Sequence, residues 1–387
     1  MFKFLNCDRH FTIADGVRDV HIVGLSLVNG LANDATGSVS AGGGCVITGR
    51  DSSLSLFNVQ LRNCHAPGSG GAIFVGLGSE LVVENTVVSG NSAGMDGGGI
   101  FLNQGSMEAV NSSVSGNSAN QNGGGICLQA SNLTVVRSSL NNNRAALDGG
   151  GVMSSDFSFL EFVEGSSVDS NVAGDEGGGV YSWESCVSLS NQSSISGNTA
   201  AGDDGGGVYS HTGSLSVSNS SINGNSAGNR GGGVYSYKAV ADNHGGRVYS
   251  IEGSGLTVFR SSIDGNAAAD DGGGVYLHTG SMEVASNSSI DGNTAGDDGG
   301  GLSAWKSTLT ASNSSIDGNA AGDIGGGVYA LSCYSITLSQ GASANSNTAE
   351  DRAGGLYVQA STLTASSSSI DGNAAGATGG GVYAISL

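Results

Sequence analysis

The amino-acid sequence predicts an all-β protein, a right-handed parallel β-helix (a solenoid) of about 13–14 coils of 26–28 residues each. Three observations predict this fold. A glycine pair followed by an apolar residue recurs with this period, a column of asparagines recurs in step with it, and the residues between them form short apolar–polar alternations typical of strands. Regular repeats of this length stack into a solenoid, and parallel crossovers are almost always right-handed.

The apolar residue after the glycines marks the first strand of each coil. These markers are Cys45, Ala72, Ile100, Ile126, Val152, Val180, Val208, Val234, Val275, Leu302, Val328, Leu356 and Val382. The chain holds 69 glycines and one proline. Glycine permits the positive φ angles and the close backbone approach that stacked coils require, so the glycines are interpreted as structural.

One coil can be read in detail over residues 208–234. Short strands are expected at 208–210, 215–217 and 220–222, with a returning turn over 225–230. The side chains expected to point inward are those of Val208, Leu215, Val217, Ile222 and Ala227.

The asparagine column is predicted to be a structural ladder. It comprises Asn63, Asn91, Asn117, Asn143, Asn171, Asn198, Asn225, Asn266, Asn293, Asn319, Asn347 and Asn373. Asparagine tolerates the left-handed conformation of a sharp turn, and stacked amides can hydrogen-bond from one coil to the next.

The repeats predict a single domain. Residues 1–40 are expected to form one or more irregular N-terminal coils, and 41–387 the regular coils, with an insertion around 236–250. The chain stops just after a marker strand, which predicts either a longer natural chain or end-to-end pairing of copies into a filament. Met1–Cys7 is too short and polar for a signal peptide, so the targeting segment of a secreted protein would lie outside this chain.

Charge and cysteine usage exclude several classes of function. The net charge of −20 argues against a nucleic-acid partner, and no apolar run is long enough to span a membrane. The cysteines lack zinc-site spacing and are expected to be mostly buried thiols, with one bridge conceivable among the first three: Cys7, Cys45, Cys64, Cys127, Cys186 and Cys333.

The repeats also resemble a known family. Gly70-Gly71-Ala72-Ile73 and Ile195-Ser196-Gly197-Asn198 resemble the paired motifs of the chlamydial polymorphic outer membrane proteins, and more widely those of pectin-lyase-like β-helix surface proteins. The resemblance covers nearly the whole chain, but the family's phenylalanine is replaced here by Ile, Val or Leu, and no membrane barrel follows. It implies a β-helix fold and, by analogy, an adhesive role at a surface.

The favoured candidate site is an aromatic strip over five or six coils. The third position after the marker supplies Trp183, His211, Tyr237, His278 and Trp305, and the first position supplies Tyr181, Tyr209, Tyr235 and Tyr276. Both positions are expected to point outward from one strand face. An exposed aromatic strip suits sugar rings or a second protein surface. The alternative is a stack covered by the insertion or by attached glycan.

The insertion is a second candidate contact site. It interrupts the period between Val234 and Val275 and gathers Lys238, His244 and Arg247, in a chain that has only 13 basic residues. A loop that stands out from a rigid scaffold often binds a partner, although a harmless duplication is the competing interpretation.

The turn before the glycines is acidic. Its carboxylates include Asp203, Asp204, Asp270, Asp271, Asp297 and Asp298. Calcium would relieve their mutual repulsion, but the turn lacks the alternating ligands of a calcium loop, so a solvated acidic edge without a cofactor is the preferred interpretation.

Possible N-glycosylation sites occur in the Asn-x-Ser/Thr pattern. They are Asn111, Asn132, Asn191, Asn219, Asn287 and Asn313. In a secreted eukaryotic protein these would be sugar acceptors on one face, although chance produces such sequences often in a chain rich in Ser and Asn.

The sequence therefore predicts a non-enzymatic extracellular protein, a structural or adhesive solenoid that binds itself, another surface protein or glycans. The alternative is a polysaccharide-active enzyme of the pectate-lyase kind, or a carbohydrate-binding protein of the tailspike kind. The enzyme is disfavoured because the carboxylates repeat like structural residues and few basic residues accompany them.

Overall fold

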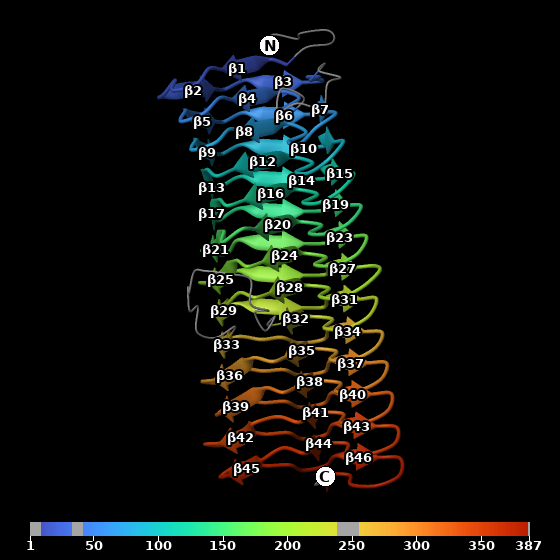
Figure 1. Ribbon diagram of the computed structural model, residues 1–387. Coiled ribbons are helices and arrows are strands. Elements are labelled where there is room, and N and C mark those ends of the chain that lie inside the picture. The colour runs from blue at the N-terminus through green and yellow to red at the C-terminus, as the bar shows by residue number, and fades with distance from the viewer. Residues whose placement is uncertain (1–8, 33–41, 238–254, 386–387) are drawn as a thin grey trace, which may run out of the picture. The chain divides into compact units, whose positions relative to one another are not determined.

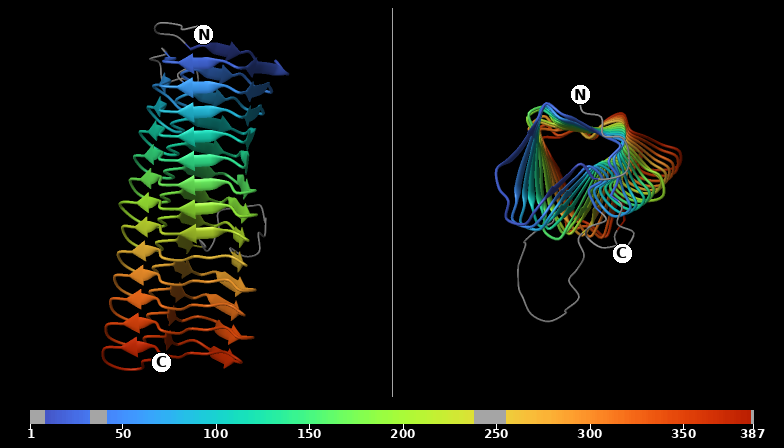
Figure 2. Two further views of the ribbon diagram at one scale, coloured as in Figure 1. Left: turned by 180° about the vertical axis from the view of Figure 1, so that it is seen from behind. Right: turned by 90° about the horizontal axis from the view of Figure 1, so that it is seen from above.

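The computed structural model describes residues 9–32, 42–237 and 255–385. It confirms the all-β prediction: the described residues contain no helix, about 49% of residues lie in strands, and the all-parallel sheets form a β-solenoid of about 12 turns. The contact pattern divides the chain into two compact units, Met1–Asp203 and Asp204–Leu387. Within each unit the strands of one sheet lie side by side, one coil after the next (Figures 1 and 2).

In the first unit each regular coil contributes to four parallel sheets. Sheet A comprises β1 (Phe11–Ile13), β4 (Val46–Thr48), β8 (Ile73–Val75), β12 (Ile100–Asn103), β16 (Ile126–Gln129), β20 (Val152–Ser155) and β24 (Val180–Trp183). Sheet B comprises β2 (Val20–Val23), β5 (Ser53–Phe57), β9 (Glu80–Glu84), β13 (Ser106–Val110), β17 (Asn132–Val136), β21 (Phe159–Val163) and β25 (Cys186–Ser190). Sheet C comprises β3 (Ser26–Val28), β6 (Gln60–Arg62), β10 (Val87–Ser89), β14 (Ser113–Ser115), β18 (Ser139–Asn141), β22 (Ser167–Asp169) and β26 (Ser194–Ser196). Sheet D comprises β7 (His65–Ala66), β11 (Ser92–Ala93), β15 (Ser118–Ala119), β19 (Arg144–Ala145), β23 (Val172–Ala173) and β27 (Thr199–Ala200).

The second unit repeats this plan. Sheet A comprises β28 (Val208–His211), β32 (Val234–Tyr237), β35 (Val275–His278), β38 (Leu302–Trp305), β41 (Val328–Leu331), β44 (Leu356–Gln359) and β47 (Val382–Ile385). Sheet B comprises β29 (Leu215–Ser218), β33 (Gly255–Phe259), β36 (Ser281–Ala285), β39 (Thr308–Ser312), β42 (Ser335–Ser339) and β45 (Leu363–Ser366). Sheet D comprises β31 (Ser226–Ala227), β34 (Ala267–Ala268), β37 (Thr294–Ala295), β40 (Ala320–Ala321), β43 (Thr348–Ala349) and β46 (Ala374–Ala375).

Sheet C changes character in the second unit. After β30 (Ser221–Asn223) the coils pair only through single-residue bridges, such as Ser262 with Ser289. In these coils the carboxylate of Asp264 accepts a hydrogen bond from the backbone N–H of Asp291 at 2.8 Å and one from the Ser289 hydroxyl at 2.9 Å. Side-chain oxygens here take the place of part of the backbone ladder.

The core lies between the sheets and is built as the alternation predicts. Val208, Leu215, Val217, Ile222 and Ala227 are all buried, at 0–4% exposure. The parsed coil differs from the prediction in one respect, since the segment interpreted as a returning turn begins with the short strand β31. Two residues of paired strand are too short to leave a readable alternation in the sequence.

Two of the predicted markers are displaced by one residue. Val46 and Ile73 pair in register with Ile100, so Cys45 and Ala72 occupy the position of the third glycine of later coils. The backbone N–H of Ala72 bonds to the carbonyl of Gly99, which places both residues in this column. The rule that the marker follows the last glycine placed it one residue early in these two coils, because Cys45 and Ala72 stand where later coils have a glycine.

The asparagine column forms a hydrogen-bonded ladder within each unit. The Asn266 amide Nδ2 donates to Asn293 Oδ1 at 3.0 Å, and Asn293 Nδ2 donates to Asn319 Oδ1 at 3.1 Å. In the first unit Asn171 donates in the same way to Asn198 at 3.0 Å. Each Nδ2 also reaches a backbone carbonyl of the neighbouring coil, as Asn266 does to Ile222 at 3.1 Å. The amides therefore satisfy each other in a buried position.

The ladder starts one residue away from the predicted position. Asn63 was assigned to the column, but Cys64 occupies it, because the Cys64 N–H donates to Asn91 Oδ1 at 2.9 Å. Cys64 is joined by a disulfide to Cys45. The bridge thus links the third-glycine column to the asparagine column, which approach closely in later coils as well: a Cβ on Gly99 would lie 3.2 Å from the Asn117 amide.

The remaining described cysteines are free. Cys127 and Cys333 are buried and Cys186 is half-buried, whereas Cys7 lies outside the described residues. Among the described residues, none belongs to a helix of the length and apolarity needed to cross a membrane.

Candidate functional site

The outer row of predicted aromatic residues forms a continuous ladder in the second unit. His211, Tyr237, His278 and Trp305 stand at the last position of β28, β32, β35 and β38, which pair in register. The ring centroids of His211 and Tyr237 are 5.0 Å apart and those of Tyr237 and His278 are 4.7 Å apart, both pairs stacked. Trp305 meets His278 edge-on at 4.6 Å.

This row is accessible to solvent. His211, Tyr237 and His278 are half-buried, and 39% of Trp305 is exposed. The Lys306 ammonium lies 5.0 Å from the Trp305 ring centroid, within cation–π range. Burial lowers the pKa of His211 and of His278, and the positive charges of Lys306 and Arg230 further lower that of His278. Both imidazoles are therefore neutral at pH 7, and the row presents uncharged ring surface.

Trp183 holds the same position on β24 in the first unit, and 38% of it is exposed. The prediction of an outward-facing third position therefore describes both tryptophans correctly.

The inner row of tyrosines does not belong to this face, which corrects the prediction of a two-row exposed strip. Tyr181, Tyr209, Tyr235 and Tyr276 are only 6–7% exposed. They point away from the main core but are covered by the turn that precedes the glycines. A Cβ built on Gly205 would lie 2.8 Å from the Tyr209 Cβ, which shows how closely the turn approaches the tyrosine.

Beneath this turn the tyrosines form a stack of their own. In the second unit the ring centroids of Tyr209 and Tyr235 are 4.9 Å apart and nearly parallel, and those of Tyr235 and Tyr276 are 5.2 Å apart. In the first unit the same column is apolar in the coils before Tyr181, with Phe74, Phe101 and Cys127 packed into one cluster. The column is thus a second, smaller core outside sheet A, and the sequence signal for it was two successive apolar residues after the glycines.

Arg230 closes the tyrosine stack of the second unit. Its guanidinium lies 5.3 Å from the Tyr235 centroid and 4.9 Å from the Tyr276 centroid. It also pairs with the nearly inaccessible carboxylate of Asp204 at 3.0 Å. Burial opposes the charge on Arg230, but Asp204, Tyr235 and Tyr276 together outweigh burial and raise the pKa of the guanidinium. Arg230 lies among the acidic residues of these turns and therefore offsets the negative charge of Asp204.

The acidic column is largely engaged in bonds between coils. Asp271 Oδ1 accepts the backbone N–H of Asp298 at 3.1 Å, and Asp298 Oδ1 accepts that of Ile324 at 3.2 Å. Burial raises the pKa of Asp271 to about 6, assisted by the charges of Asp270 and Asp297. Burial and the charge of Asp271 raise the pKa of Asp298 to about 7. These carboxylates are therefore more buried than the predicted solvated edge.

Three carboxylates of the second unit approach closely enough to share a ligand. One oxygen from each of Asp270, Asp271 and Asp297 lies within 4.8 Å of the others. Oxygen ligands of this kind suit a hard cation such as calcium, and calcium binding there stays the alternative to an acidic edge without a cofactor. Asp203 belongs to the first unit, where its N–H bonds to the Asp175 carbonyl.

All six predicted glycosylation asparagines are exposed. Asn132 lies in β17, whereas the other five occupy a corner after sheet B with φ between 45° and 63°. The serine that follows the corner is buried and bonds between coils; the Ser112 hydroxyl, for example, donates to the Val110 carbonyl at 2.8 Å and accepts the Thr86 N–H at 3.0 Å. The first two residues of the recurring Asn-Ser-Ser sequence therefore have structural roles: the asparagine forms the corner, and the first serine makes the buried hydrogen bonds.

The predicted insertion residues Lys238, His244 and Arg247 lie outside the described residues.

No family model, curated protein or solved structure matches this chain.

Proposed function

We propose that the protein is a non-enzymatic extracellular solenoid with a structural or adhesive role, and that the aromatic ladder His211–Tyr237–His278–Trp305 is its contact face. The ladder carries the proposal. Four rings on consecutive coils, with the terminal tryptophan exposed, form a continuous aromatic surface that a single coil could not provide. Aromatic surface that remains accessible on a rigid scaffold is typical of an interface.

The partner is expected to bring a ring or an apolar face. A pyranose ring or an aromatic side chain of a second surface protein would pack on the exposed ring of Trp305 and against the outer edge of Tyr237, whose two faces are covered by His211 and His278. The resemblance to chlamydial polymorphic outer membrane proteins agrees with a surface role.

The acidic column supports a non-enzymatic role. A general acid and base must reach a substrate, but Asp271 and Asp298 each accept a backbone N–H of the next coil and Asp204 is held by Arg230. These residues are occupied in holding coils together.

The test compares W305A with the matched control Y334A, because Tyr334 is a more exposed aromatic residue of the same unit, 72% exposed, outside the ladder. Binding to a glycan array and to immobilised surface-protein extracts should fall at least tenfold for W305A and stay unchanged for Y334A. Equal binding by W305A and the parent chain would contradict the contact face. Release of reducing ends or unsaturated products from a polysaccharide would contradict the non-enzymatic role.

A further inference from the structure

A polar groove of about 370 Å³ lies along one corner of the first unit, between sheets B and C. None of its lining residues belongs to the aromatic ladder, and nothing in the proposed function uses it.

The corner residues give the groove its first wall. Asn85, Asn111 and Arg137 each follow a strand of sheet B and adopt left-handed φ angles of 45–49°. Their side chains lie outside the corner, because the next residue of each coil turns into the buried hydroxyl row; Ser112 and Ser138, for example, are only 5–6% exposed. At each corner, therefore, a residue with an amide or a guanidinium group points outward, and the serine or threonine after it points inward.

Sheet C supplies the second wall. Ser113, Ser139 and Ser167 are the first residues of β14, β18 and β22, and all three are half-buried and line the groove. The Ser139 hydroxyl donates to the Ser113 hydroxyl at 3.3 Å, so the hydroxyls form a row with the period of the coils.

One end of the groove is shaped by an extra residue. Between β21 and β22 the corner contains both Glu164 and Gly165, with φ of 55° and 75°. A Cβ on Gly165 would meet no atom within 4 Å, so the space beside this glycine is open. Glu164 follows Val163 as Arg137 follows Val136 one coil earlier, and the two side chains form an ion pair.

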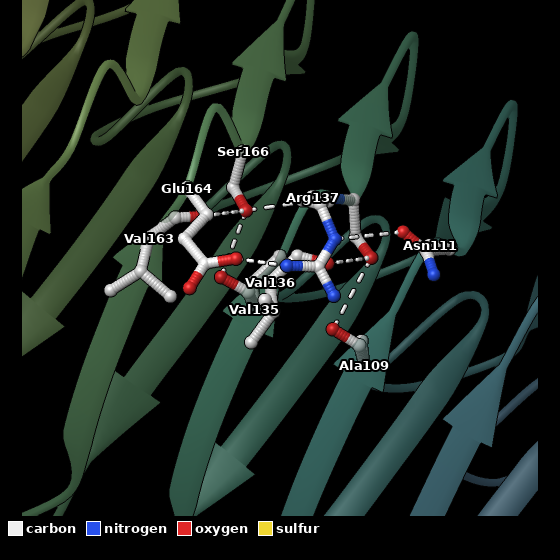
Figure 3. A network of polar contacts seen from close by, with 9 residues as sticks. Ala109, Asn111, Val135, Val136, Arg137, Val163, Glu164 and Ser166 are labelled. Atoms are coloured by element: carbon white, nitrogen blue, oxygen red, sulfur yellow. Dashed lines mark hydrogen bonds and ion pairs between the residues drawn. The ribbon is translucent and has the colours of Figure 1, made fainter.

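The guanidinium of Arg137 is held in a fixed orientation (Figure 3). Its Nε donates to Asn111 Oδ1 at 3.0 Å, and its Nη1 donates to the Glu164 carboxylate. Its Nη2 makes no hydrogen bond to any residue in the described part of the chain. The groove thus contains an oriented donor whose positive charge is compensated.

We propose that this groove binds a neutral sugar of one or two rings. The wall offers hydroxyls and amides, which can both donate to and accept from sugar hydroxyls, and Val87 adds a small apolar surface for a C–H face. The groove volume falls in the range of about 300–1,000 Å³ typical of small-molecule sites. A charged ligand is disfavoured, because Glu164 cancels the charge of Arg137 and the chain carries a net charge of −20.

The test uses the full chain made in a bacterial host, so that Asn111 carries no glycan of its own. Maltose, lactose and cellobiose are titrated by calorimetry and by saturation-transfer NMR, with glucuronate and sulfate as charged comparisons. S113W should fill the groove and abolish binding. Its matched control is S115W, because Ser115 is half-buried on the same strand, points to the same face and does not line the groove.

Two further variants test the ligand chemistry. R137A should weaken disaccharide binding about tenfold through loss of the oriented donor, whereas R144A, an exposed arginine outside the groove, should not. E164Q should leave disaccharide binding in place and add glucuronate binding at low salt, because it uncovers the charge of Arg137. Binding of glucuronate or sulfate but of no neutral sugar by the parent chain would overturn the assignment. So would binding unaffected by S113W, or no binding of any of the three disaccharides at 20 mM, a concentration roughly twenty times a millimolar Kd.

Discussion

The guanidinium of Arg230 lies 4.9 Å from the ring centroid of Tyr276, in the following coil, while it pairs with Asp204 of the preceding coil at 3.0 Å. The side chain of Arg230 therefore links three successive coils outside the main core. It lies where the neighbouring carboxylates would otherwise repel one another.

Removal of this fastening should destabilise the second unit. R230A leaves the Asp204 carboxylate, whose side chain is 3% exposed, buried without its partner. The expected loss of unfolding free energy is about 3 kcal/mol, measured by denaturant titration. R352A is the control, because Arg352 and Asp351 are both more than a third exposed and their pair is screened by water. An equal effect of the two substitutions would contradict the special role of Arg230.

The buried carboxylates should make stability fall as pH rises. Asp271 and Asp298 have pKa values of about 6 and 7, against an ordinary value of 3.8. The folded chain therefore holds protons that the unfolded chain releases, so their contribution is present below about pH 4 and is lost as pH rises through 6 to 7. We expect the melting temperature of the second unit to decrease over this window.

The substitution D298N should flatten that decrease, because it removes the carboxyl group with the highest pKa and also relieves Asp271 of a neighbouring charge. Scans at pH 4.5, 6 and 7.5 check both statements. A melting temperature that rises from pH 4.5 to 7.5 in the parent chain, or an unchanged slope in D298N, would show that other groups dominate. His211 and His278 act in the opposite sense below pH 6.5, because burial lowers their pKa.

Two inward serines should respond in opposite ways to the same substitution. The Ser210 hydroxyl is buried without a hydrogen-bond partner among the described residues, whereas the Ser182 hydroxyl donates to the Ser185 carbonyl at 3.1 Å. S210A should stabilise by about 1 kcal/mol and S182A should destabilise by a similar amount. Calorimetric scans of both variants give the sign directly, and two changes of the same sign would count against this bonding pattern.

The asparagine ladder should be far more sensitive than the exposed asparagines. N266A removes two bonds donated by the side chain and two accepted from Asn225, at a cost of about 3 kcal/mol. N313G is the control, because Asn313 is exposed and its φ of 48° suits glycine. Its expected change is within about 0.5 kcal/mol by denaturant unfolding. Comparable losses would indicate that the ladder bonds contribute little.

The Cys45–Cys64 bridge should be replaceable by the residues of later coils. C45G/C64N restores a glycine beside an asparagine, and the new amide can donate to Asn91 Oδ1 and to the Leu27 carbonyl. This variant should fold with a stability close to that of the oxidised parent, and its stability should not change when a reducing agent is added. C45A/C64A should lose about 3 kcal/mol. Equal loss in both variants would mean that the covalent link itself is required.

The repeat predicted most of the fold, because the same residue types recur wherever the same backbone geometry is required. Val208, Leu215, Val217 and Ile222 could be assigned to the core from alternation alone, and the structure buries them all. The register of the first coils could not be found this way. Cys45 and Ala72 replace glycine there, and only strand pairing reveals the shift.

The candidate site was only half predictable, for a physical reason. Alternation tells which side of a strand a side chain occupies, but not whether another segment covers that side. Tyr209 and His211 lie on the same side of β28, yet the turn before the glycines covers Tyr209 and leaves His211 partly accessible. The polar groove could not be predicted from the sequence for a similar reason, since its walls come from two sheets and four successive coils.

The corner at Glu164–Gly165 shows where such a chain can be lengthened. The extra residue is absorbed there with two positive φ angles, while the strands on either side, β21 and β22, keep their pairing with β17 and β18. Corners are thus the positions of the molecule that accept insertions. A new loop can be inserted into one coil there without changing the contacts between the other coils, so each coil can acquire its own surface while the strand pairing stays the same.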